Sequence, residues 1–297
     1  MKMNGEMMAI KITDLNTPET ITWCPGCGDM AILMGVKGAI AELGVEQKDI
    51  VIVSGIGCSS YVPQYVKTYG VHSLHGRSLP VASGIKLANN KLTVIAEGGD
   101  GDGYGIGMGH FIHIMRRNID LTYIVHNNAI YGLTKGQTSP TSKKGMVTKS
   151  TPAGSLEEPV NPEALAILGG ATFVARVYAG DVVHMKKIMV EAVKHKGFAL
   201  VDVLQPCVTY NSFNTYQFWQ QRVYKLEDEK GYDVKNKWKA LERASEQGMH
   251  ADRIPIGIFY KEERPTYEDG VPEIRDVPCA KQPIDGIQIG KILERYK

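Results

Sequence analysis

The chain of 297 residues has no long apolar run, almost no net charge and few cysteines. No segment approaches the roughly 18 apolar residues that a membrane-spanning helix needs, and residues 1–15 lack the apolar core of a signal peptide. A formal net charge of +2 gives no strong field to attract nucleic acid or an anionic membrane. Five cysteines, an odd number, do not suit a secreted disulfide framework. We therefore expect a cytoplasmic protein that binds neither nucleic acid nor a membrane.

The remaining composition is that of an ordinary globular protein, with 43% hydrophobic and 22% charged residues. Short apolar runs of strand type alternate with segments in which apolar residues recur at helical spacing. Such βα alternation is typical of a parallel sheet whose crossovers are helices. We therefore predict an α/β fold, a doubly wound parallel sheet with helices on both faces. The predicted strands are residues 49–54, 92–96, 121–125, 171–177 and 198–204, and the predicted helices include residues 32–43, 61–69, 79–89, 161–168, 181–194 and 215–226.

The predicted domain organisation has three parts. Residues 1–21 form an N-terminal arm, residues 22–225 form the main domain, and residues 226–297 form an irregular C-terminal extension suited to wrap a partner subunit. Within the main domain, residues 72–76 are a predicted loop, and a second loop rich in Gly, Ser, Thr, Lys and Pro runs from about residue 129 to residue 159. A loop of that length is uncommon in a compact domain unless it is functional or covered by a partner.

The unit at residues 98–128 carries the clearest chemical pattern. It begins where the predicted strand at 92–96 ends, passes through a glycine-rich loop and a helix-like segment, and finishes after the strand at 121–125. Because βαβ crossovers return each strand in the same direction, Asp100 and Asn128 are expected at the same carboxyl edge of the sheet. Glycine amides and a helix N-terminus suit an anion there, and two oxygen ligands suit Mg²⁺ that also holds a diphosphate.

Two simpler interpretations of this loop compete with a diphosphate site. A calcium loop is excluded, because Tyr104 and Phe111 occupy the fifth and twelfth positions, where oxygen ligands are required. A glycine-rich turn without a ligand is common at strand ends, so the loop taken alone does not establish a site.

Four of the five cysteines lie in turns rich in glycine or proline. Cys24 and Cys27 form the motif CPGCG, Cys58 lies in GIGCSS and Cys207 lies in QPC. Four soft thiolates suit a [4Fe–4S] cluster or a structural zinc ion. One CxxC pair with two distant cysteines matches neither zinc-ribbon nor ferredoxin spacing, so a cluster, zinc and unrelated buried cysteines all stay open on spacing alone. Cys279 stands in a proline-rich tail without such a context.

The sequence GDG at residues 99–101, followed by 25 residues and then Asn127 and Asn128, resembles the diphosphate-binding signature of thiamine-diphosphate enzymes. Together with the cysteines, the pattern resembles the β subunit of the 2-oxoacid:ferredoxin oxidoreductases over about residues 22–225. Several long motifs in the right order make this resemblance more specific than any single motif. They are WCPGCG at 23–28, SGIGCSS at 54–60, HSLHGRSLPVASGIKLAN at 72–89, GGDGDGYGIGMGHF at 98–111, HNNAIYGLTKGQTSPT at 126–141 and VDVLQPC at 201–207, with RIPIGIFY at 253–260 similar to the family's tail.

The resemblance implies which residues hold the cofactors. Three groups are expected to bind Mg²⁺: the side chains of Asp100 and Asn128 and the main-chain carbonyl of Ile130. Ile56 is expected to hold the thiamine cofactor in its bent shape. The cysteines expected to ligate one [4Fe–4S] cluster are Cys24, Cys27, Cys58 and Cys207. The residues expected to bind thiamine diphosphate are Ile56, Gly57, Cys58, Ser59, His75, Gly99, Asp100, Gly101, Asp102, Asn128, Ile130, Gly132 and Leu133.

The resemblance also implies an activity, the thiamine-dependent oxidative decarboxylation of a 2-oxoacid with coenzyme A to acyl-CoA and CO₂. Electrons are expected to pass singly through the cluster to ferredoxin. An α subunit is the expected partner, because in this family it supplies the aminopyrimidine half of the thiamine site, including the glutamate that promotes ylide formation. The chain alone is therefore expected to be inactive.

Tyr61 and Arg77 are the expected substrate contacts. Some family members that accept 2-oxoglutarate carry a basic residue three positions after the third cluster cysteine, where this chain has Tyr61. Because a neutral tyrosine cannot balance a second carboxylate as lysine or arginine would, we expect pyruvate or another monocarboxylate 2-oxoacid.

Two other functions stay open. The diphosphate-binding half of a non-redox thiamine decarboxylase or synthase would explain Asp100 and Asn128 but would leave the four cysteines unused. A zinc-stapled binding module without catalysis would leave the spacing of Asp100 and Asn128 to chance. We favour the redox enzyme because it accounts for both features.

Overall fold

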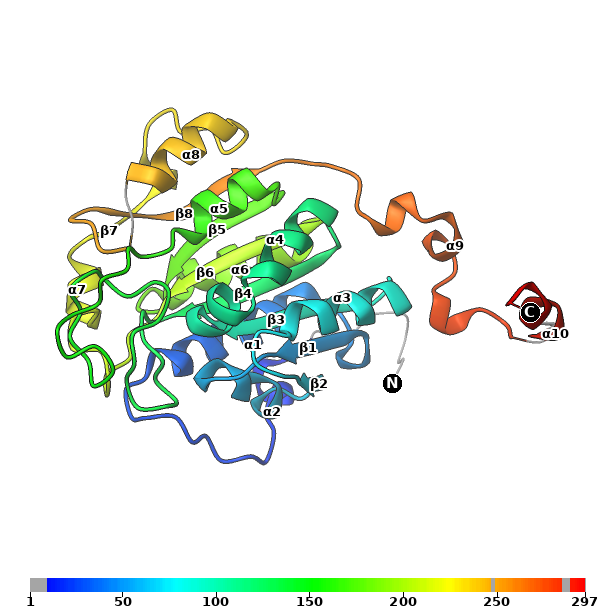
Figure 1. The fold of residues 1–297 in the computed structure, drawn as a ribbon, viewed down its shortest axis with the longest axis horizontal. Helices are drawn as coiled ribbons and strands as arrows, with labels where there is room; N and C mark the ends of the chain where they lie inside the picture. The colour runs from blue at the N-terminus through cyan, green and yellow to red at the C-terminus, as the bar shows by residue number, and fades with distance from the viewer. Residues whose placement is uncertain (1–9, 247–248, 285–288, 297) are drawn as a thin grey trace.

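The computed structural model describes residues 10–246, 249–284 and 289–296, and these form an eight-stranded sheet in the order β2-β1-β3-β4-β6-β5-β8-β7 (Figure 1). Neighbouring strands from β2 to β5 run parallel, whereas β8 is antiparallel to β5. The predicted parallel sheet is therefore confirmed where strands and helices alternate. The strands are β1 (Ile50–Ser54), β2 (Tyr69–His72), β3 (Thr93–Gly99), β4 (Leu121–Asn127), β5 (Phe173–Tyr178), β6 (Phe198–Leu204), β7 (Val223–Lys225) and β8 (Ile254–Lys261).

The central strands are apolar runs covered on both faces. Every residue of β1, β4, β5 and β6 is buried, as expected for parallel strands between two helical layers. In the register of β3 and β4, Gly99 lies opposite His126, and in that of β4 and β6, Asn127 lies opposite Leu204. The loops that follow these three strands therefore begin together at one edge of the sheet.

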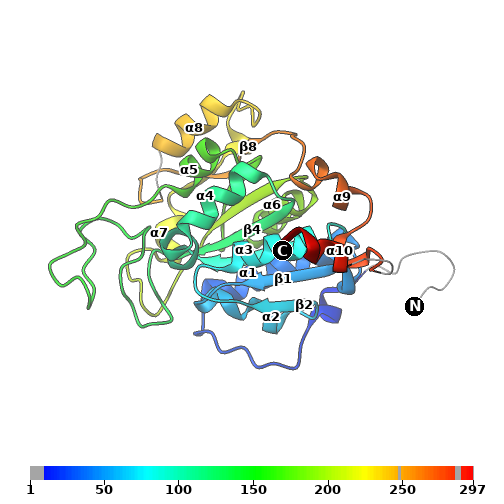
Figure 2. The same cartoon turned by 45° about the vertical axis from the view of Figure 1, so that its right-hand side comes forward.

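Helices cover both faces of the sheet, which confirms the doubly wound arrangement (Figures 1 and 2). The larger helices are α1 (Gly28–Leu43), α3 (Ser78–Ala88), α4 (Met108–Arg117), α5 (Pro162–Gly169), α6 (Val182–Lys194) and α8 (Lys237–Glu246). α1 and α6 share one apolar core cluster with Ile95 of β3. α3, α4, α5 and α8 share another with Val94 and Ala96. Alternate residues of β3 thus face opposite helical layers, as the strand period of two requires.

The first cysteines are placed by the start of α1. Cys27 is the N-cap residue of this helix, and Gly44 ends it in the left-handed conformation, with φ of 67°, which glycine adopts without strain. Residues 1–9 of the predicted N-terminal arm lie outside the described residues. The rest of the arm contains the turn Ile12–Leu15, and Leu15 is fully buried. This part of the arm is therefore anchored to the domain.

The predicted helix over residues 61–69 is largely wrong. Here the chain forms the single-turn α2 (Val62–Tyr65) and then β2, an edge strand parallel to β1. The residues of β2 are mostly exposed, because an edge strand has a neighbour on one side only. β2 therefore lacks the apolar run that marks a buried strand in the sequence. The predicted loop at residues 72–76 begins where β2 ends.

Residues 226–297 were predicted to form an irregular extension. In the structure, regular helix and strand continue as far as the end of β8. The predicted helix at residues 215–226 is replaced by the short α7 (Tyr216–Gln220) followed by β7. α8 forms in the polar stretch after residue 226, and its buried Ala240 and Ala244 join the second core cluster. β8 extends the sheet antiparallel to β5, and one apolar run in a sequence does not reveal that direction.

The chain leaves the sheet after Lys261, which ends β8. Figure 1 shows this orange-to-red segment running away from the sheet through the short α9 (Pro272–Arg275) and α10 (Ile289–Leu293). The sheet therefore ends later than the predicted boundary at residue 225. Among the helices of the described ranges, none has both the length and the apolar character to cross a membrane.

Candidate active site

A cavity of about 310 Å³ opens where β1, β3 and β4 end. Its walls are the loops that follow these strands, and we call it the glycine-lined cavity. All thirteen residues predicted to bind thiamine diphosphate line it, from Ile56 in the loop after β1 to Leu133 in the loop after β4. The structure thus brings together residues that lie up to 77 positions apart, from 56 to 133. Their roles as ligands stay predictions.

Asp100 is held by the long loop that follows β4. Its carboxylate is buried and accepts hydrogen bonds from the hydroxyls of Ser139 and Thr141. Burial nevertheless raises the pKa of Asp100 to about 6, since these hydrogen bonds only partly replace the lost hydration. A bound divalent cation would favour the ionised carboxylate. The long loop thus supports Asp100, and whether a partner covers the loop stays a prediction.

Asp102 joins two neighbouring loops. Its Oδ1 accepts hydrogen bonds from the main-chain N–H groups of Ile56 at 2.9 Å and Gly76 at 2.7 Å, and it lies 2.9 Å from Nδ1 of His75. A Cβ atom at Gly55 would lie only 1.9 Å from Asp102 Oδ2, so this close approach requires glycine. Asp102 lines the cavity, and the contacts that the structure describes position the loop containing Ile56.

Asn128 and Ile130 follow β4 and line the same cavity as Asp100. The Asn128 amide donates to Gln205 Oε1 at 2.6 Å, and its Oδ1 accepts from the Ile130 N–H at 3.1 Å. Ala129 between them has φ of 56°, an uncommon conformation for a residue with a side chain and one that often marks a functional site. Asp100, Asn128 and Ile130 line one cavity with oxygen donors of the kind that Mg²⁺ prefers.

The lining of the cavity also suits an anion. The Ser59 hydroxyl is buried and has no hydrogen-bond partner among the residues that the structure describes, which a ligand oxygen would supply. Gly101 leaves no room for a side chain, because its Cβ would lie 2.1 Å from the Tyr131 ring. The main chain of GDG is therefore open to the cavity on one side and packed on the other. These features fit a diphosphate.

A second cavity, of about 250 Å³, is lined by Cys24, Cys27, Cys58 and Cys207. We call it the cysteine-lined cavity. The Trp23 indole N–H donates to the Cys58 carbonyl at 2.8 Å, which joins the loop before α1 to the loop after β1. The four predicted cluster cysteines therefore meet, although up to 183 positions separate them, from 24 to 207.

The thiols surround a space, and they do not converge on a point. Within the described ranges, no three side chains of His, Cys, Asp or Glu lie close enough together to hold one metal ion. The four thiols line one shared cavity, so each of them is open to a group bound there. Burial and the nearby Asp29 carboxylate raise the pKa of the Cys58 thiol to about 12, and the pKa of Cys27 is also raised by burial. Thiolates here need a cationic centre to balance them.

The two cavities are neighbours. Asp29, Cys58, Asn128, Gly132 and Leu133 line both of them. A Cβ atom at Gly132 would lie 3.5 Å from Cys207 Sγ and 3.8 Å from Cys58 Sγ. The wall between the cavities is therefore thin.

The sequence patterns missed a buried chain of ionisable groups at the glycine-lined cavity, two of which, Asp29 and His126, line it. His126 lies between Asp29, at 2.6 Å, and Glu97, at 2.9 Å. Burial opposes the protonation of His126, but its hydrogen bonds to both carboxylates outweigh burial and raise its pKa to about 9. Asp29 and His126 stand inside the motifs WCPGCGD and HNN, and no local pattern indicates that they meet.

The two predicted substrate contacts lie elsewhere. Tyr61 lines the cysteine-lined cavity and stacks on Tyr65, with ring centroids 6.3 Å apart. Arg77 is exposed, and its guanidinium lies 2.6 Å from Nε2 of His110. Neither residue is among those described as lining the glycine-lined cavity. Their contact with the substrate stays a prediction, and it would have to come from the rim of the site.

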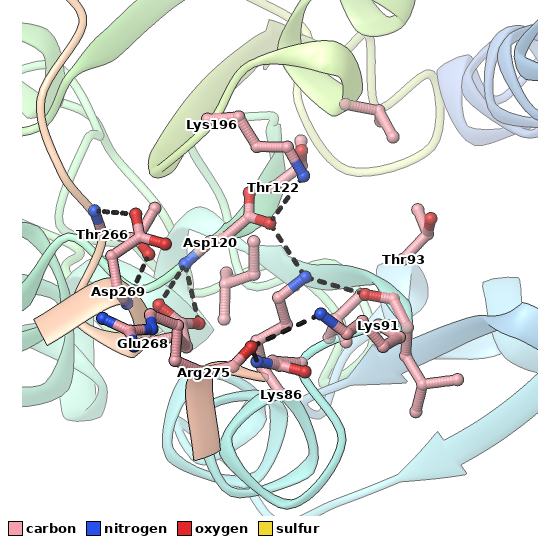
Figure 3. Close-up of a pocket in the computed structure, with 15 residues that line it drawn as sticks. Lys86, Lys91, Thr93, Asp120, Thr122, Lys196, Thr266, Glu268, Asp269 and Arg275 are labelled. Carbon is pink, nitrogen blue, oxygen red and sulfur yellow. Dashed lines mark hydrogen bonds and ion pairs between the residues drawn. The ribbon is translucent and has the colours of Figure 1, made fainter. Parts of the chain in front are cut away.

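A larger cavity, of about 460 Å³, lies at the opposite edge of the sheet, where β3 and β4 begin (Figure 3). Several of its charged groups are linked in one network. Lys86 and Lys196 lie 2.9 Å and 3.3 Å from the Asp120 carboxylate, and the Asp120 N–H donates to Glu268 at 3.1 Å. Because Glu268 belongs to the segment after β8, we interpret this network as the anchor of that segment.

Comparisons with known proteins agree with the geometry. The family model for the thiamine pyrophosphate enzyme C-terminal TPP-binding domain matches residues 55–203, and that for the C-terminal part of the pyruvate ferredoxin oxidoreductase beta subunit matches residues 207–276. The chain is 50% identical over 285 residues to a 2-oxoacid:ferredoxin oxidoreductase subunit beta from a Sulfolobus species, covering 91% of this chain and 92% of the relative.

A second relative, a subunit beta of the same name from Saccharolobus solfataricus, is 52% identical over 84% of this chain and 85% of its own length. Among solved structures, a 2-oxoglutarate:ferredoxin oxidoreductase from Magnetococcus marinus, with 2-oxoglutarate, coenzyme A and succinyl-CoA bound, matches with a TM-score of 0.89 and 38% identity. That match covers 99% of this chain and 98% of the solved chain.

Proposed function

Because this chain belongs to the family of 2-oxoacid:ferredoxin oxidoreductase β subunits, we propose that it forms the diphosphate half of a thiamine site next to a [4Fe–4S] cluster. With its α subunit, the enzyme converts a 2-oxoacid and coenzyme A to acyl-CoA and CO₂. Electrons leave singly through the cluster to ferredoxin. The observation that carries the proposal is the thin wall shared by the glycine-lined and cysteine-lined cavities.

The glycine-lined cavity would hold thiamine diphosphate and Mg²⁺. Asp100, Asn128 and the carbonyl of Ile130 are the proposed metal ligands. The unpartnered Ser59 hydroxyl and the amides of the GDG loop would bind the diphosphate, because N–H and O–H groups neutralise its charge at a strand end. Ile56 lines the same cavity, where its side chain would support the bent cofactor.

The cysteine-lined cavity would hold the cluster, with Cys24, Cys27, Cys58 and Cys207 as ligands. When bound, thiamine diphosphate supplies a nucleophilic carbon that lets the 2-oxoacid lose CO₂, and the cluster takes up the electrons one at a time. The role of this chain is to keep the two groups adjacent, to hold their charges and to exclude water between them. Gly132 lies between the two cavities, because a Cβ atom there would be in ordinary van der Waals contact with the thiols of Cys207 and Cys58.

The α subunit would dock at the mouth of the glycine-lined cavity. Leu74 and Ile106 are 74% and 56% exposed, and Leu133, which lines the cavity, is 46% exposed. The turn that contains Leu74 lies against Ile106, because a Cβ atom at Gly76 would be 2.5 Å from the Ile106 side chain. Exposed apolar residues around a cavity rim are typical of a surface that a partner covers.

For the substrate we propose a monocarboxylate 2-oxoacid such as pyruvate. Tyr61 gives the site no charge to balance a second carboxylate. The solved relative from Magnetococcus marinus has 2-oxoglutarate bound. We therefore propose that this chain and that relative differ in their preferred 2-oxoacid. A basic side chain from the α subunit would reverse this preference.

The test is the metal content of the chain purified with its α subunit in the absence of oxygen. We expect about four iron and four sulfide per β chain, together with Mg²⁺ and thiamine diphosphate. Cys24→Ala, at a cysteine that lines only the cysteine-lined cavity, should lose the iron and keep the thiamine, whereas Cys279→Ala, at an exposed cysteine far along the chain, should lose neither. Thiamine without iron would indicate a non-redox decarboxylase, and zinc without thiamine would indicate a binding module.

A further inference from the structure

Gln205 is a buried side chain that contacts both proposed cofactor sites. It directly follows β6 and is 1% exposed. Its main-chain N–H donates to the Asn127 carbonyl at 2.9 Å, which continues the pairing of β6 with β4 by one residue. The position of Gln205 is therefore set by the sheet itself.

The side-chain amide of Gln205 has one consistent orientation. Its Nε2 donates to the Pro206 carbonyl at 3.2 Å and to Cys27 Sγ at 3.3 Å. A carbonyl oxygen can only accept, so the NH₂ group must face Pro206 and Cys27. Oε1 then faces Asn128, whose amide donates to it at 2.6 Å.

The same logic orients Asn128. Because its NH₂ group faces Gln205, its Oδ1 is the atom that accepts from the Ile130 N–H at 3.1 Å. Asn128 thus keeps its oxygen on the side of Ile130, the residue whose carbonyl is the other proposed metal ligand in this loop. A rotated amide would present a nitrogen, which does not bind Mg²⁺.

Packing prevents Gln205 from turning away. A Cβ atom at Gly28 would lie 2.8 Å from both Gln205 Cγ and Pro206 Cδ, so the start of α1 lies directly on the glutamine. The Gly28 N–H also donates to the Pro206 carbonyl at 3.1 Å. The helix that positions Cys27 and the turn that positions Gln205 are thus held together by this hydrogen bond and by close packing.

We infer that Gln205 is a positioning residue that couples the two cofactor sites. Its N–H hydrogen bond to Cys27 Sγ would raise the reduction potential of a cluster held there, and its carbonyl holds the Asn128 amide with the oxygen on the side of Ile130, available to a metal ion. The first effect follows because the reduced cluster carries one more negative charge, so an N–H donor at a ligand sulfur stabilises that state more. This inference rests on the proposed function, since it requires both cofactors.

Two substitutions at Gln205 separate its two roles. Gln205→Glu has the same size and keeps an oxygen acceptor for Asn128, but it removes the donor to Cys27 and adds a negative charge beside it. Gln205→Met removes both the donor and the acceptor. Gln220→Glu makes the same change of charge on the exposed face of α7 and serves as the control.

The measurements are made on each variant in complex with the α subunit, under exclusion of oxygen. The cluster's midpoint potential is obtained by redox titration followed by electron paramagnetic resonance. The affinity for thiamine diphosphate is obtained by titration of cofactor-depleted complex with Mg²⁺ present. Neither readout depends on turnover.

We expect Gln205→Glu and Gln205→Met to lower the potential, with the larger effect in the glutamate variant. For Gln205→Glu, the ratio of reduced to oxidised cluster at a fixed ambient potential should fall about tenfold, which corresponds to about 59 mV for a one-electron couple. Gln205→Met should also weaken thiamine diphosphate binding several-fold, and Gln205→Glu and Gln220→Glu should not. Because the glutamate variant is isosteric, it tests the potential even where Gln205→Met fails to assemble.

A potential unchanged in both Gln205 variants would overturn the inferred effect on the cluster. Wild-type thiamine affinity in Gln205→Met would overturn the inferred effect on Asn128. A wild-type complex that binds thiamine diphosphate and no iron would instead refute the proposed redox function, and that outcome is visible before any variant is made.

Discussion

Replacement of Gly101 by alanine tests how closely the wall of the glycine-lined cavity is packed. The added methyl group would lie 2.1 Å from Tyr131 Cε1, whereas ordinary contact begins at 3.4 Å, so the ring must move by about 1.3 Å, the difference of the two. Gly101 is not among the residues with positive φ, so the backbone itself tolerates alanine. The cost is overpacking, which typically amounts to about 1–3 kcal/mol.

The movement of Tyr131 should reach the ligand. Its ring lines the cavity, and its hydroxyl donates to the Gly101 carbonyl at 3.1 Å, a bond that the displaced ring would lose. We therefore expect Gly101→Ala to weaken thiamine diphosphate binding at least about tenfold, equivalent to about 1.4 kcal/mol. The midpoint of thermal unfolding should also fall.

Gly109→Ala is the matched control for this change. Gly109 lies in α4, and a Cβ atom there would meet no atom within 4 Å. Gly109 lies in the first turn of α4, where alanine is the better helix former, so this variant should be at least as stable as the wild type and should bind the cofactor normally. Binding is measured as fluorescence quenching in the complex with the α subunit. If Gly101→Ala binds thiamine diphosphate with wild-type affinity, the close packing of Tyr131 on Gly101 does not shape the binding site.

Two further predictions concern pH and substrate choice. Burial, and after it the charge of Lys261, lowers the pKa of His195 from 6.5 to about 4. The unfolded chain therefore takes up a proton on His195 at a higher pH than the folded protein does. The contribution of His195 to the free energy of unfolding is present above pH 6.5 and is lost as the pH falls toward 4, by about 3 kcal/mol at most. The free energy of unfolding of His195→Gln, measured with denaturant, should not show this decrease between pH 6.5 and 4. If the wild type and His195→Gln show the same pH dependence, His195 is not its cause. Tyr61→Arg should raise the 2-oxoglutarate:pyruvate ratio of kcat/KM, and an unchanged ratio would remove Tyr61 from the choice of substrate.

The membership of the enzyme family and the doubly wound sheet were predicted from the sequence and are confirmed. These features depend on local patterns that tertiary packing does not alter. A buried parallel strand must be an apolar run, and a ligand loop at its end must contain glycines and oxygen donors. Once Asp100 and Asn128 are assigned to the ends of two parallel strands, their meeting at one edge follows from the direction of the crossover.

The sequence failed to predict secondary-structure elements whose own residues show little hydrophobic periodicity. β2 is an exposed edge strand, and its alternation of burial is too weak to distinguish it from a turn. α8 is polar around most of its surface, and it is recognisable only by the small residues Ala240 and Ala244 that it buries. β2 is stabilised by pairing with the preceding strand β1, and α8 is stabilised by packing in the second core cluster.

The sequence by itself therefore determined the fold class, the family and the loops that carry the site, because each is encoded within one strand, one turn or one motif. Tertiary structure alone decided which distant side chains support those loops. Ser139 and Thr141 reach Asp100 from the long loop, and Gln205 joins Cys27 to Asn128. Such partners are selected by the three-dimensional path of the chain, since a hydrogen bond needs atoms within about 3 Å and no particular spacing along the sequence.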